Sequence, residues 1–173
     1  LGRALLKAIP FQAGSIHYQF KDEKFDLNDL SGSSLKAFRQ HAQMVFQDPY
    51  GSLNPRLTVR DIIAEPLEAM QLTQNRNKTD VRVREIATRC RLDLEHLRRF
   101  PHAFSGGQRQ RISIARALIC RPSFIVADEA VAALDVSIQA EILELMKELQ
   151  KELGLTIPFI SHDLSVIANP VSY

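Results

Sequence analysis

Three stretches of the chain repeat apolar residues every three or four positions, the spacing that places them on one face of an α-helix. The apolar positions are Val83, Ile86, Ala87 and Cys90 in the first stretch, Ile112, Ala115, Leu118 and Ile119 in the second, and Ile138, Ile142, Leu145, Leu149 and Leu153 in the third. The third stretch stops at Gly154, a residue type that readily takes the left-handed conformation at helix ends. We therefore expect three helices, each with one buried face.

Short apolar runs without this spacing predict strands. Residues 124–127 form one run between a proline and two acids, and residues 156–160 form a second, in which Pro158 is tolerable only near the start or on an edge. A strand, a helix and a second strand make a right-handed crossover, so the two strands are parallel and their carboxyl ends lie at one edge of the sheet. Ligands of open α/β sheets bind at that edge.

The pattern of helix and strand signals divides the chain into three parts. Residues 1–47 alternate helix and strand signals, with "GSIHYQF" and "QMVFQ" as the strands, and residues 48–104 follow a turn-rich opening, "DPYGSLNPRLT", with helical patterns. Thr58 and Asp61 have the spacing of a helix cap. We expect residues 1–47 and 105–173 to form an α/β core, and residues 48–104 to form an inserted helical subdomain.

Composition narrows the class of protein. The formal net charge is only +2, against 45% hydrophobic residues, which disfavours a dedicated nucleic-acid binder and favours a packed core. No long uncharged apolar run spans a membrane, and no signal-peptide pattern opens the chain. Cys90 and Cys120 lack metal-ligand spacing, which suits a reducing cytosol.

A Ser-Gly-Gly-Gln cluster stands directly before the second helical stretch, in "PHAFSGGQRQRISIARALI". The first turn of a helix has free backbone N–H groups and the positive end of the macrodipole, so it attracts anions. Ser105 suits the cap position, while Gly106 and Gly107 have no Cβ to hold a ligand away. The cluster is consistent with a phosphate-facing helix start. For the cluster alone, an ordinary capped helix with a glycine-containing loop before it is the favoured explanation.

Acids and a histidine leave the two predicted parallel strands at their carboxyl ends. Asp128 and Glu129 follow the first strand, and Ser161 and His162 follow the second. In phosphoryl transfer an Asp can hold Mg²⁺, a Glu can orient or deprotonate water, and a His can donate to the γ-phosphate. Taken singly, Asp128 could instead cap the next helix and His162 could be a partly buried strand-end residue. Together they favour the chemistry.

Five motifs resemble those of ATP-binding-cassette (ABC) ATPases. In chain order "VFQD" is similar to the Q-loop, "FSGGQRQR" to the signature motif, "FIVADE" to the Walker B strand, "AALD" to the D-loop and "SHD" to the histidine switch. The resemblance implies a P-loop NTPase-type α/β fold with a mostly parallel sheet. The run "VFQDPYGSLNPRLTVRDIIAEPL" further resembles the oligopeptide, dipeptide and nickel importer branch.

The resemblance also assigns roles, with ATP and Mg²⁺ as cofactors. It implies that Glu129 is the general base, that His162 contacts the γ-phosphate and that Asp128 lies near Mg²⁺. Gln47 would sense Mg²⁺ and the γ-phosphate and couple to the membrane subunit. The residues implied to close over an ATP held by a second cassette, or to bridge the two subunits, are Ser105, Gly106, Gly107, Gln108 and Asp135.

The sequence departs from the family at three places. None of the seven glycines opens a G-x-x-x-x-G-K-S/T run, and "LGRALL" resembles the helix that comes after that P-loop in the family, so we expect a fragment truncated at both ends. Ala130 and Ala132 replace residues common in the family, and neither change removes a catalytic group.

As a whole the sequence predicts the ATPase subunit of a peptide-type importer. It would pair with a second ABC ATPase subunit and with transmembrane permease subunits, at the cytoplasmic face of a bacterial membrane, without nucleic acid. Two other interpretations stay open: a non-transport ABC ATPase, and an inert remnant that only binds partners. The sequence does not identify the substrate, because permease and binding protein select it.

Overall fold

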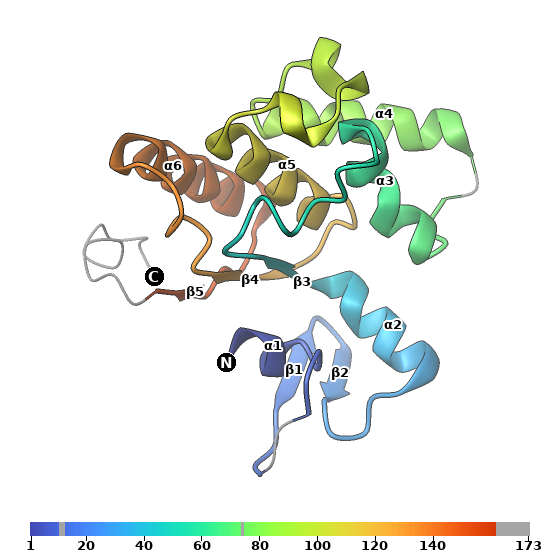
Figure 1. The fold of residues 1–173 in the computed structure, drawn as a ribbon. Coiled ribbons are helices and arrows are strands. Elements are labelled where there is room, and N and C mark those ends of the chain that lie inside the picture. The colour runs from blue at the N-terminus through green and yellow to red at the C-terminus, as the bar shows by residue number, and fades with distance from the viewer. Residues whose placement is uncertain (11–12, 74, 162–173) are drawn as a thin grey trace.

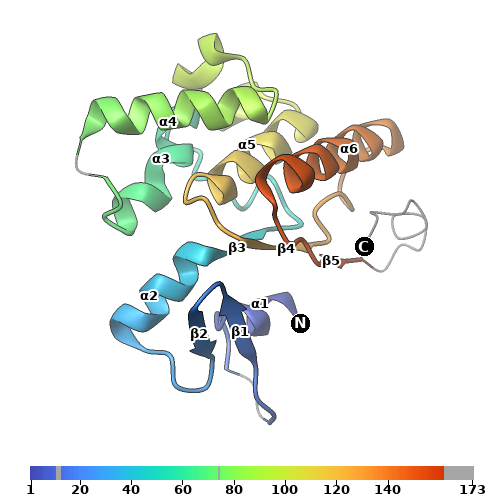
Figure 2. The ribbon, with the colours of Figure 1, turned by 180° about the vertical axis from the view of Figure 1, so that it is seen from behind.

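The computed structural model describes residues 1–10, 13–73 and 75–161. A three-stranded parallel sheet, in the order β3, β4, β5, divides the molecule into two layers (Figure 1). The strands of this sheet are β3 (Ala42–Val45), β4 (Phe124–Asp128) and β5 (Phe159–Ile160). Seen from behind, the longer helices α3 to α6 still lie on one side of the sheet, while a hairpin and helices α1 and α2 lie on the other (Figure 2).

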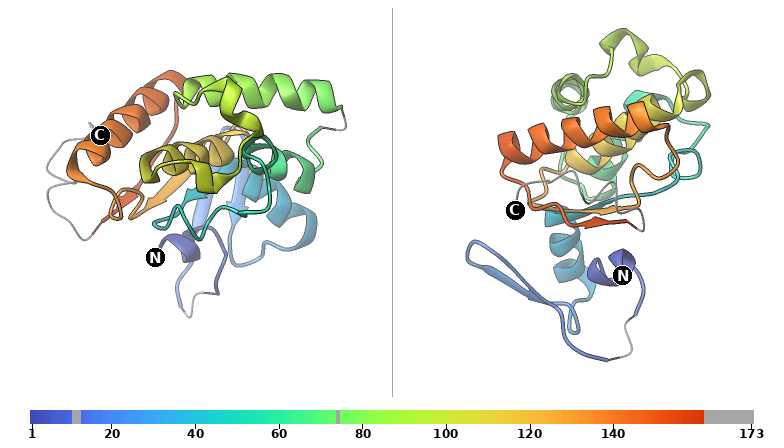
Figure 3. Two further views of the ribbon diagram at one scale, coloured as in Figure 1. Left: turned by 45° about the horizontal axis from the view of Figure 1, so that its top comes forward. Right: turned by 90° about the vertical axis from the view of Figure 1, so that its left-hand side faces the viewer.

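Helices α3 to α6 form the larger layer, and the views in Figure 3 show them stacked over the sheet. They are α3 (Val59–Ala69), α4 (Arg76–Arg89), α5 (Gly106–Leu118) and α6 (Val136–Leu153), with the 3₁₀ turns η1 (Leu94–Arg98) and η2 (Pro101–Ala103) before α5. The smaller layer consists of α1 (Gly2–Leu5), α2 (Gly32–His41) and an antiparallel hairpin of β1 (His17–Phe20) and β2 (Glu23–Asp26). The sheet is thus covered on both faces, as parallel sheets require.

Alternate residues of β4 belong to different cores because successive side chains of a strand point to opposite faces. Ile125 and Ala127 pack with the apolar faces of α3 to α6. Val126 packs instead with Leu27 and Phe38 of the smaller layer. All three β4 residues are at most 2% exposed. The unbroken apolar run predicted from the sequence is explained by this burial on both faces.

The predicted helical faces are confirmed except at the ends of the third, where Ile138 is only half-buried and Leu153 is exposed. Val83, Ile86, Ala87 and Cys90 are buried along α4 and at its end. Helix α6 ends at Gly154, whose φ of 63° is left-handed. At the start of α3, the Thr58 hydroxyl accepts a hydrogen bond from the Asp61 backbone N–H, at 3.3 Å. These local signals were sufficient because each depends on a few neighbouring residues.

Two predicted strands are shorter than their apolar runs. Residues 156–160 contribute one isolated bridge, Thr156 to Phe124, and only then the two residues of β5. Pro158 lies between these two pairings and has no N–H for the ladder, although its carbonyl accepts from the Ala127 N–H at 3.0 Å. The β3 strand ends at Val45, so Phe46 and Gln47 lie beyond the sheet.

Within the described ranges, no helix is long and apolar enough to cross a bilayer. The division into residues 1–47, 48–104 and 105–173 stays a prediction, since α3 and α4 share one apolar core with α5 and α6.

Candidate functional site

The carboxyl ends of the three parallel strands bring predicted site residues to one edge of the sheet. Asp128 pairs with Ile160, so Glu129 and Ser161 leave β4 and β5 side by side. On the other side of β4, Val45 pairs with Ala127, and Gln47 follows two residues later. Gln47 is exposed, whereas Asp128 and Glu129 are half-buried. His162 lies outside the described residues.

Glu129 has an unusual backbone conformation. Its φ is 50°, in the left-handed region that non-glycine residues seldom adopt. Its N–H donates to the Ile160 carbonyl at 2.8 Å, and its own carbonyl accepts from the Ala132 N–H at 3.0 Å. The chain therefore turns sharply at Glu129 while its N–H remains part of the ladder. Such backbone outliers concentrate at functional sites.

The first helix starts against this edge. A Cβ atom on Gly2 would lie 3.2 Å from Asp128 Oδ2, 3.0 Å from Val126 Cγ1 and 3.2 Å from Ile160 Cδ1. Contacts this short are tighter than side chains normally make, so the absence of a Cβ on Gly2 lets the start of α1 approach β4 and β5 without displacing their side chains. The beginning of α1 and the Asp128 carboxylate are direct neighbours. This relation was not among the sequence predictions.

Asp128 does not cap a helix. The next helix, α6, has Asp135 at its N-cap, and the Asp135 side chain makes no capping hydrogen bond. The alternative that Asp128 is simply a helix cap is therefore wrong. Its carboxylate faces the start of α1 instead.

The signature cluster forms a reciprocal cap at the start of α5. The Gln108 N–H donates to Ser105 Oγ at 3.4 Å, and the Ser105 N–H donates to Gln108 Oε1 at 3.0 Å. This capping box satisfies donors of the first turn. The prediction that Ser105 caps the helix is confirmed. Both side chains are exposed, so they are accessible to a ligand or partner at the helix start.

The two glycines of the cluster face neighbouring segments of the chain. A Cβ on Gly107 would lie 2.6 Å from Ile138 Cγ2, so this buried glycine lets α5 approach α6. A Cβ on Gly106 would lie 3.2 Å from Leu134 Cδ2 and 3.9 Å from the Tyr50 hydroxyl. The sequence reasoning explained both glycines by ligand access. For Gly107 the structure gives helix packing as the reason.

Three arginines follow the cluster, and each has a different neighbour. Arg111 forms an ion pair with Glu141 of α6 at 3.0 Å. Arg109 lies over the ring of Tyr50, with Cζ 4.1 Å from the ring centroid. Arg116 contacts the segment after β3 and also α3, so all three arginines connect α5 to other elements.

Sequence reasoning missed Gln110, which is fully buried in α5. Neither its amide nitrogen nor its amide oxygen has a hydrogen-bond partner in the part of the chain that is described. A signal for its burial was available, since Gln110 is three residues after Gly107 and thus on the same helical face. The residue type gave no indication of this burial, because a glutamine among arginines is usually exposed to solvent.

Oxygen ligands at the sheet edge suit Mg²⁺, which binds through one or two carboxylates plus phosphates and water. Asp128 and Gln47 leave neighbouring strands there. Across residues 1–10, 13–73 and 75–161, no group of three or more His, Cys, Asp and Glu side chains could hold a metal alone. The Asp128 carboxylate and the Gln47 amide oxygen are oxygen ligands of the kind that fits Mg²⁺ shared with a nucleotide.

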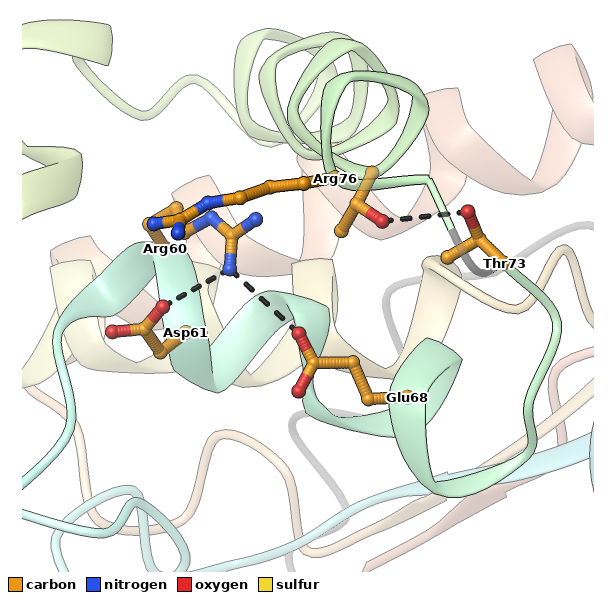
Figure 4. Close-up of a pocket in the computed structure, with 6 residues that line it drawn as sticks. Arg60, Asp61, Glu68, Thr73 and Arg76 are labelled. Atoms are coloured by element: carbon orange, nitrogen blue, oxygen red, sulfur yellow. Dashed lines mark hydrogen bonds and ion pairs between the residues drawn. The ribbon is translucent and has the colours of Figure 1, made fainter.

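A separate polar pocket lies between α3 and α4 (Figure 4). Arg60 is at its centre and contacts Asp61 at 3.1 Å, Glu68 at 3.8 Å and Asp80 at 2.6 Å. Three carboxylates thus surround one guanidinium, and Asp80 comes from α4 while the others come from α3. The pocket is a junction between two helices, remote in sequence from the predicted site residues.

The structure is an α/β core with predicted site residues at the carboxyl edge of its parallel sheet, and similarity to known proteins identifies its family. Residues 1–132 match the family described as ABC transporter, so the chain belongs to the ABC transporter family. The oligopeptide transport ATP-binding protein OppF of Streptococcus mutans serotype c is 50% identical over 167 residues, covering 96% of this chain and 53% of that protein. The dipeptide transport ATP-binding protein DppF of Lactococcus lactis subsp. cremoris is 48% identical over 169 residues, covering 96% and 53%.

A solved structure gives the same result for the fold. The ATP-binding cassette MJ0796, in a dimeric post-hydrolysis state bound to ADP and Pi, has a TM-score of 0.78 and 29% identity, covering 95% of this chain and 69% of that one. The predicted α/β cassette fold is therefore confirmed, and so is the membership of the ABC family that the five motifs predicted. The chain spans about half the length of the curated relatives it matches.

Proposed function

We propose that the whole protein is the ATP-hydrolysing subunit of an ABC importer for peptides or similar small solutes. The observation that carries this proposal is the approach of Gly2 to Asp128 at the carboxyl edge of the sheet. The start of α1, where the family places its phosphate loop, is thereby next to an acid and to the strand ends of β4 and β5. A triphosphate held there would lie within reach of Glu129 and of the segment that contains Gln47.

The roles proposed for the sheet-edge residues follow from their chemistry. Glu129 is the general base that orients and deprotonates the attacking water, and its turned backbone carries the residue out of the strand direction. Asp128 and Gln47 are the proposed oxygen ligands of Mg²⁺. That ion would neutralise charge that develops on the phosphate oxygens. His162 is proposed as a donor to the γ-phosphate.

The start of α5 is proposed to act on a second subunit. Ser105, Gly106 and Gln108 lie at the first turn of α5, where backbone N–H groups and the macrodipole favour phosphate. Gly107 supports that turn by its contact with α6. Asp135, exposed at the start of α6, is the proposed bridge between the two subunits.

Peptide uptake and the permease partners are proposed from the relatives. OppF and DppF carry oligopeptide and dipeptide transport in their names. Their identity of about half extends over nearly this whole chain, including the segment after Gln47. We therefore propose transmembrane permease subunits as partners, at the inner face of a bacterial membrane, with the permease and its binding protein selecting the substrate.

The assignment of Glu129 can be tested in the full-length protein with a Glu129→Gln variant. The amide keeps the shape of the side chain but cannot take a proton, so hydrolysis should fall by roughly 10²–10⁴-fold while ATP still binds. The measurements are phosphate release at saturating Mg-ATP and equilibrium ATP binding.

A matched control is Glu144→Gln on the exposed face of α6, which removes one carboxylate without touching the sheet edge. It should hydrolyse ATP at the wild-type rate. Near-normal turnover of Glu129→Gln would remove Glu129 from the mechanism.

A further inference from the structure

Arg109 connects the signature helix to the segment that carries Gln47. Its guanidinium lies over the Tyr50 ring at 4.1 Å, three residues beyond Gln47. The same guanidinium donates to the carbonyls of Phe104 at 3.0 Å and His102 at 3.4 Å. One side chain therefore contacts the segment after β3 and the turn before α5 at once.

The turn that presents Tyr50 is fixed by Asp48. Its carboxylate accepts from the Tyr50 N–H at 2.8 Å, and its carbonyl accepts from the Ser52 N–H at 3.1 Å. Tyr50 itself is 59% exposed, so little apolar packing holds its ring. Arg109 contacts this ring directly, with Cζ 4.1 Å from its centroid.

Arg116 attaches the same segment further along α5. It donates to the Ser52 carbonyl at 3.2 Å and forms an ion pair with Glu65 of α3 at 2.8 Å. Arg109 and Arg116 are about two helical turns apart and so lie on one face of α5. The segment of residues 50–52 thus runs along this face between two arginine contacts.

The Tyr50 hydroxyl also reaches the mouth of the signature helix. It lies 3.9 Å from the position of a Cβ on Gly106, whose other neighbour is Leu134. Leu134 precedes Asp135 at the start of α6. The first turn of α5 is therefore packed between the Gln47 segment and the segment that leads to Asp135.

We propose that Arg109 is a positioning residue, and that its stack on Tyr50 transmits the position of the Gln47 segment to the signature turn. The proposal rests on the proposed function, since it concerns ATP-driven closure of two subunits. When the Gln47 segment moves toward a bound phosphate, Tyr50 moves with it, and Arg109 carries that displacement to Ser105 and Gly106. The closure of the signature turn over the second subunit then depends on whether Gln47 of the same subunit contacts a bound phosphate.

The test uses the full-length protein in a Glu129→Gln background, in which ATP-driven dimers accumulate. Tyr50→Leu and Arg109→Gln should each weaken ATP-driven dimer formation by about 2- to 30-fold, the range expected for residues that couple two sites. ATP binding to the separate subunits should stay at the level of the parent. Light scattering measures the dimer, and titration at low protein concentration measures ATP binding.

Conservative variants distinguish the stack from general stability. Tyr50→Phe keeps the ring and should retain dimer formation, and Arg109→Lys keeps the charge but loses the fork to Phe104 and His102, so it should be intermediate. The double variant Tyr50→Leu with Arg109→Gln should be no weaker than the stronger single variant, because both remove one contact. Arg111→Gln breaks the ion pair to Glu141 on the same helix and should lower only the unfolding temperature.

Fully additive effects of Tyr50→Leu and Arg109→Gln, or wild-type dimer formation in both, would overturn the proposal. So would a loss in Tyr50→Phe as large as in Tyr50→Leu. These outcomes are separate from failure of the proposed function. That failure would be seen earlier, as a full-length protein that releases no phosphate from Mg-ATP.

Discussion

Gly107 of α5 and Ile138 of α6 lie so close that a Cβ on the glycine would be 2.6 Å from Ile138 Cγ2. Gly107 is buried, so an added methyl group cannot turn toward solvent. We expect Gly107→Ala to destabilise the protein by about 1–3 kcal/mol, the usual cost of overpacking a core contact. Denaturant unfolding of the full-length protein measures this change.

Gly106→Ala is the matched control for that substitution. Its Cβ would lie 3.2 Å from the Leu134 side chain, a smaller overlap, and Gly106 is only half-buried. The free energy of unfolding should fall less than for Gly107→Ala. Helix propensity favours alanine over glycine at both positions, so the difference between the two variants reports the contact with Ile138. Equal losses at both positions would show that this contact does not determine the effect.

Local sequence signals predicted most of the fold because each signal reports a contact within a few residues. The capping pair Thr58 and Asp61, the stripe of α6 and the end of α6 at Gly154 are of this kind. The length of β5 was not predictable from apolar residues alone. Its pairing depends on where Pro158 falls relative to the ladder of β4, which is a property of the tertiary register.

The site was predicted in part for the same reason. Asp128 and Glu129 could be located because they follow a strand, and parallel strands share an edge. Gln47 was indicated only by the resemblance of "VFQD" to the Q-loop. The contact of Arg109 with Tyr50 joins residues far apart along the chain, and no local pattern indicates it. The packing role of Gly107 likewise required the position of α6.

The pair Thr58 and Asp61 should make stability depend on pH. The Thr58 hydroxyl donates to Asp61 Oδ2 at 2.6 Å, and this hydrogen bond is the main reason that the pKa of Asp61 lies below its usual 3.8. Partial burial acts in the opposite direction and raises the pKa, while the neighbouring Arg60 lowers it. Because the pKa is depressed in the folded state, the stabilisation is present above the unfolded value. It is lost as pH falls through the folded pKa.

Thr58→Val removes both the cap and the donor to Asp61. At neutral pH we expect a loss of about 0.5–2 kcal/mol, typical for an N-cap. Below about pH 4 the difference from the parent should shrink, since protonated Asp61 no longer gains from the hydroxyl. Thr58→Ser keeps the hydroxyl and should follow the parent curve. If the free energy of unfolding of Thr58→Val differs from that of the parent by the same amount at every pH, the Thr58 hydroxyl does not stabilise the Asp61 carboxylate.

The two cysteines should be unreactive in the folded protein. Burial raises the pKa of Cys90 to about 12 and that of Cys120 to about 11, so almost no thiolate exists at about pH 8. We expect iodoacetamide to leave both residues unmodified in native protein and to alkylate both after unfolding in guanidinium chloride. Peptide mass spectrometry reads each site separately. Rapid native labelling of Cys90 would show that the α4 and α5 layer opens readily.

Residues 1–173 alone should not hydrolyse ATP. Catalysis of phosphoryl transfer is mostly positioning and charge stabilisation, and Asp128 and Glu129 act only on a triphosphate that something else holds in line. The sequence contains no G-x-x-x-x-G-K-S/T run to cradle the β- and γ-phosphates. Purified polypeptide of residues 1–173 is therefore expected to release no phosphate above background in a malachite-green assay and to bind ATP weakly at most.

The full-length protein is the positive control for this assay, and residues 1–173 carrying Glu129→Gln are the control for contaminating ATPases. Background turnover that survives Glu129→Gln comes from another enzyme. Robust turnover that this substitution abolishes would mean that residues 1–173 hold the triphosphate by themselves.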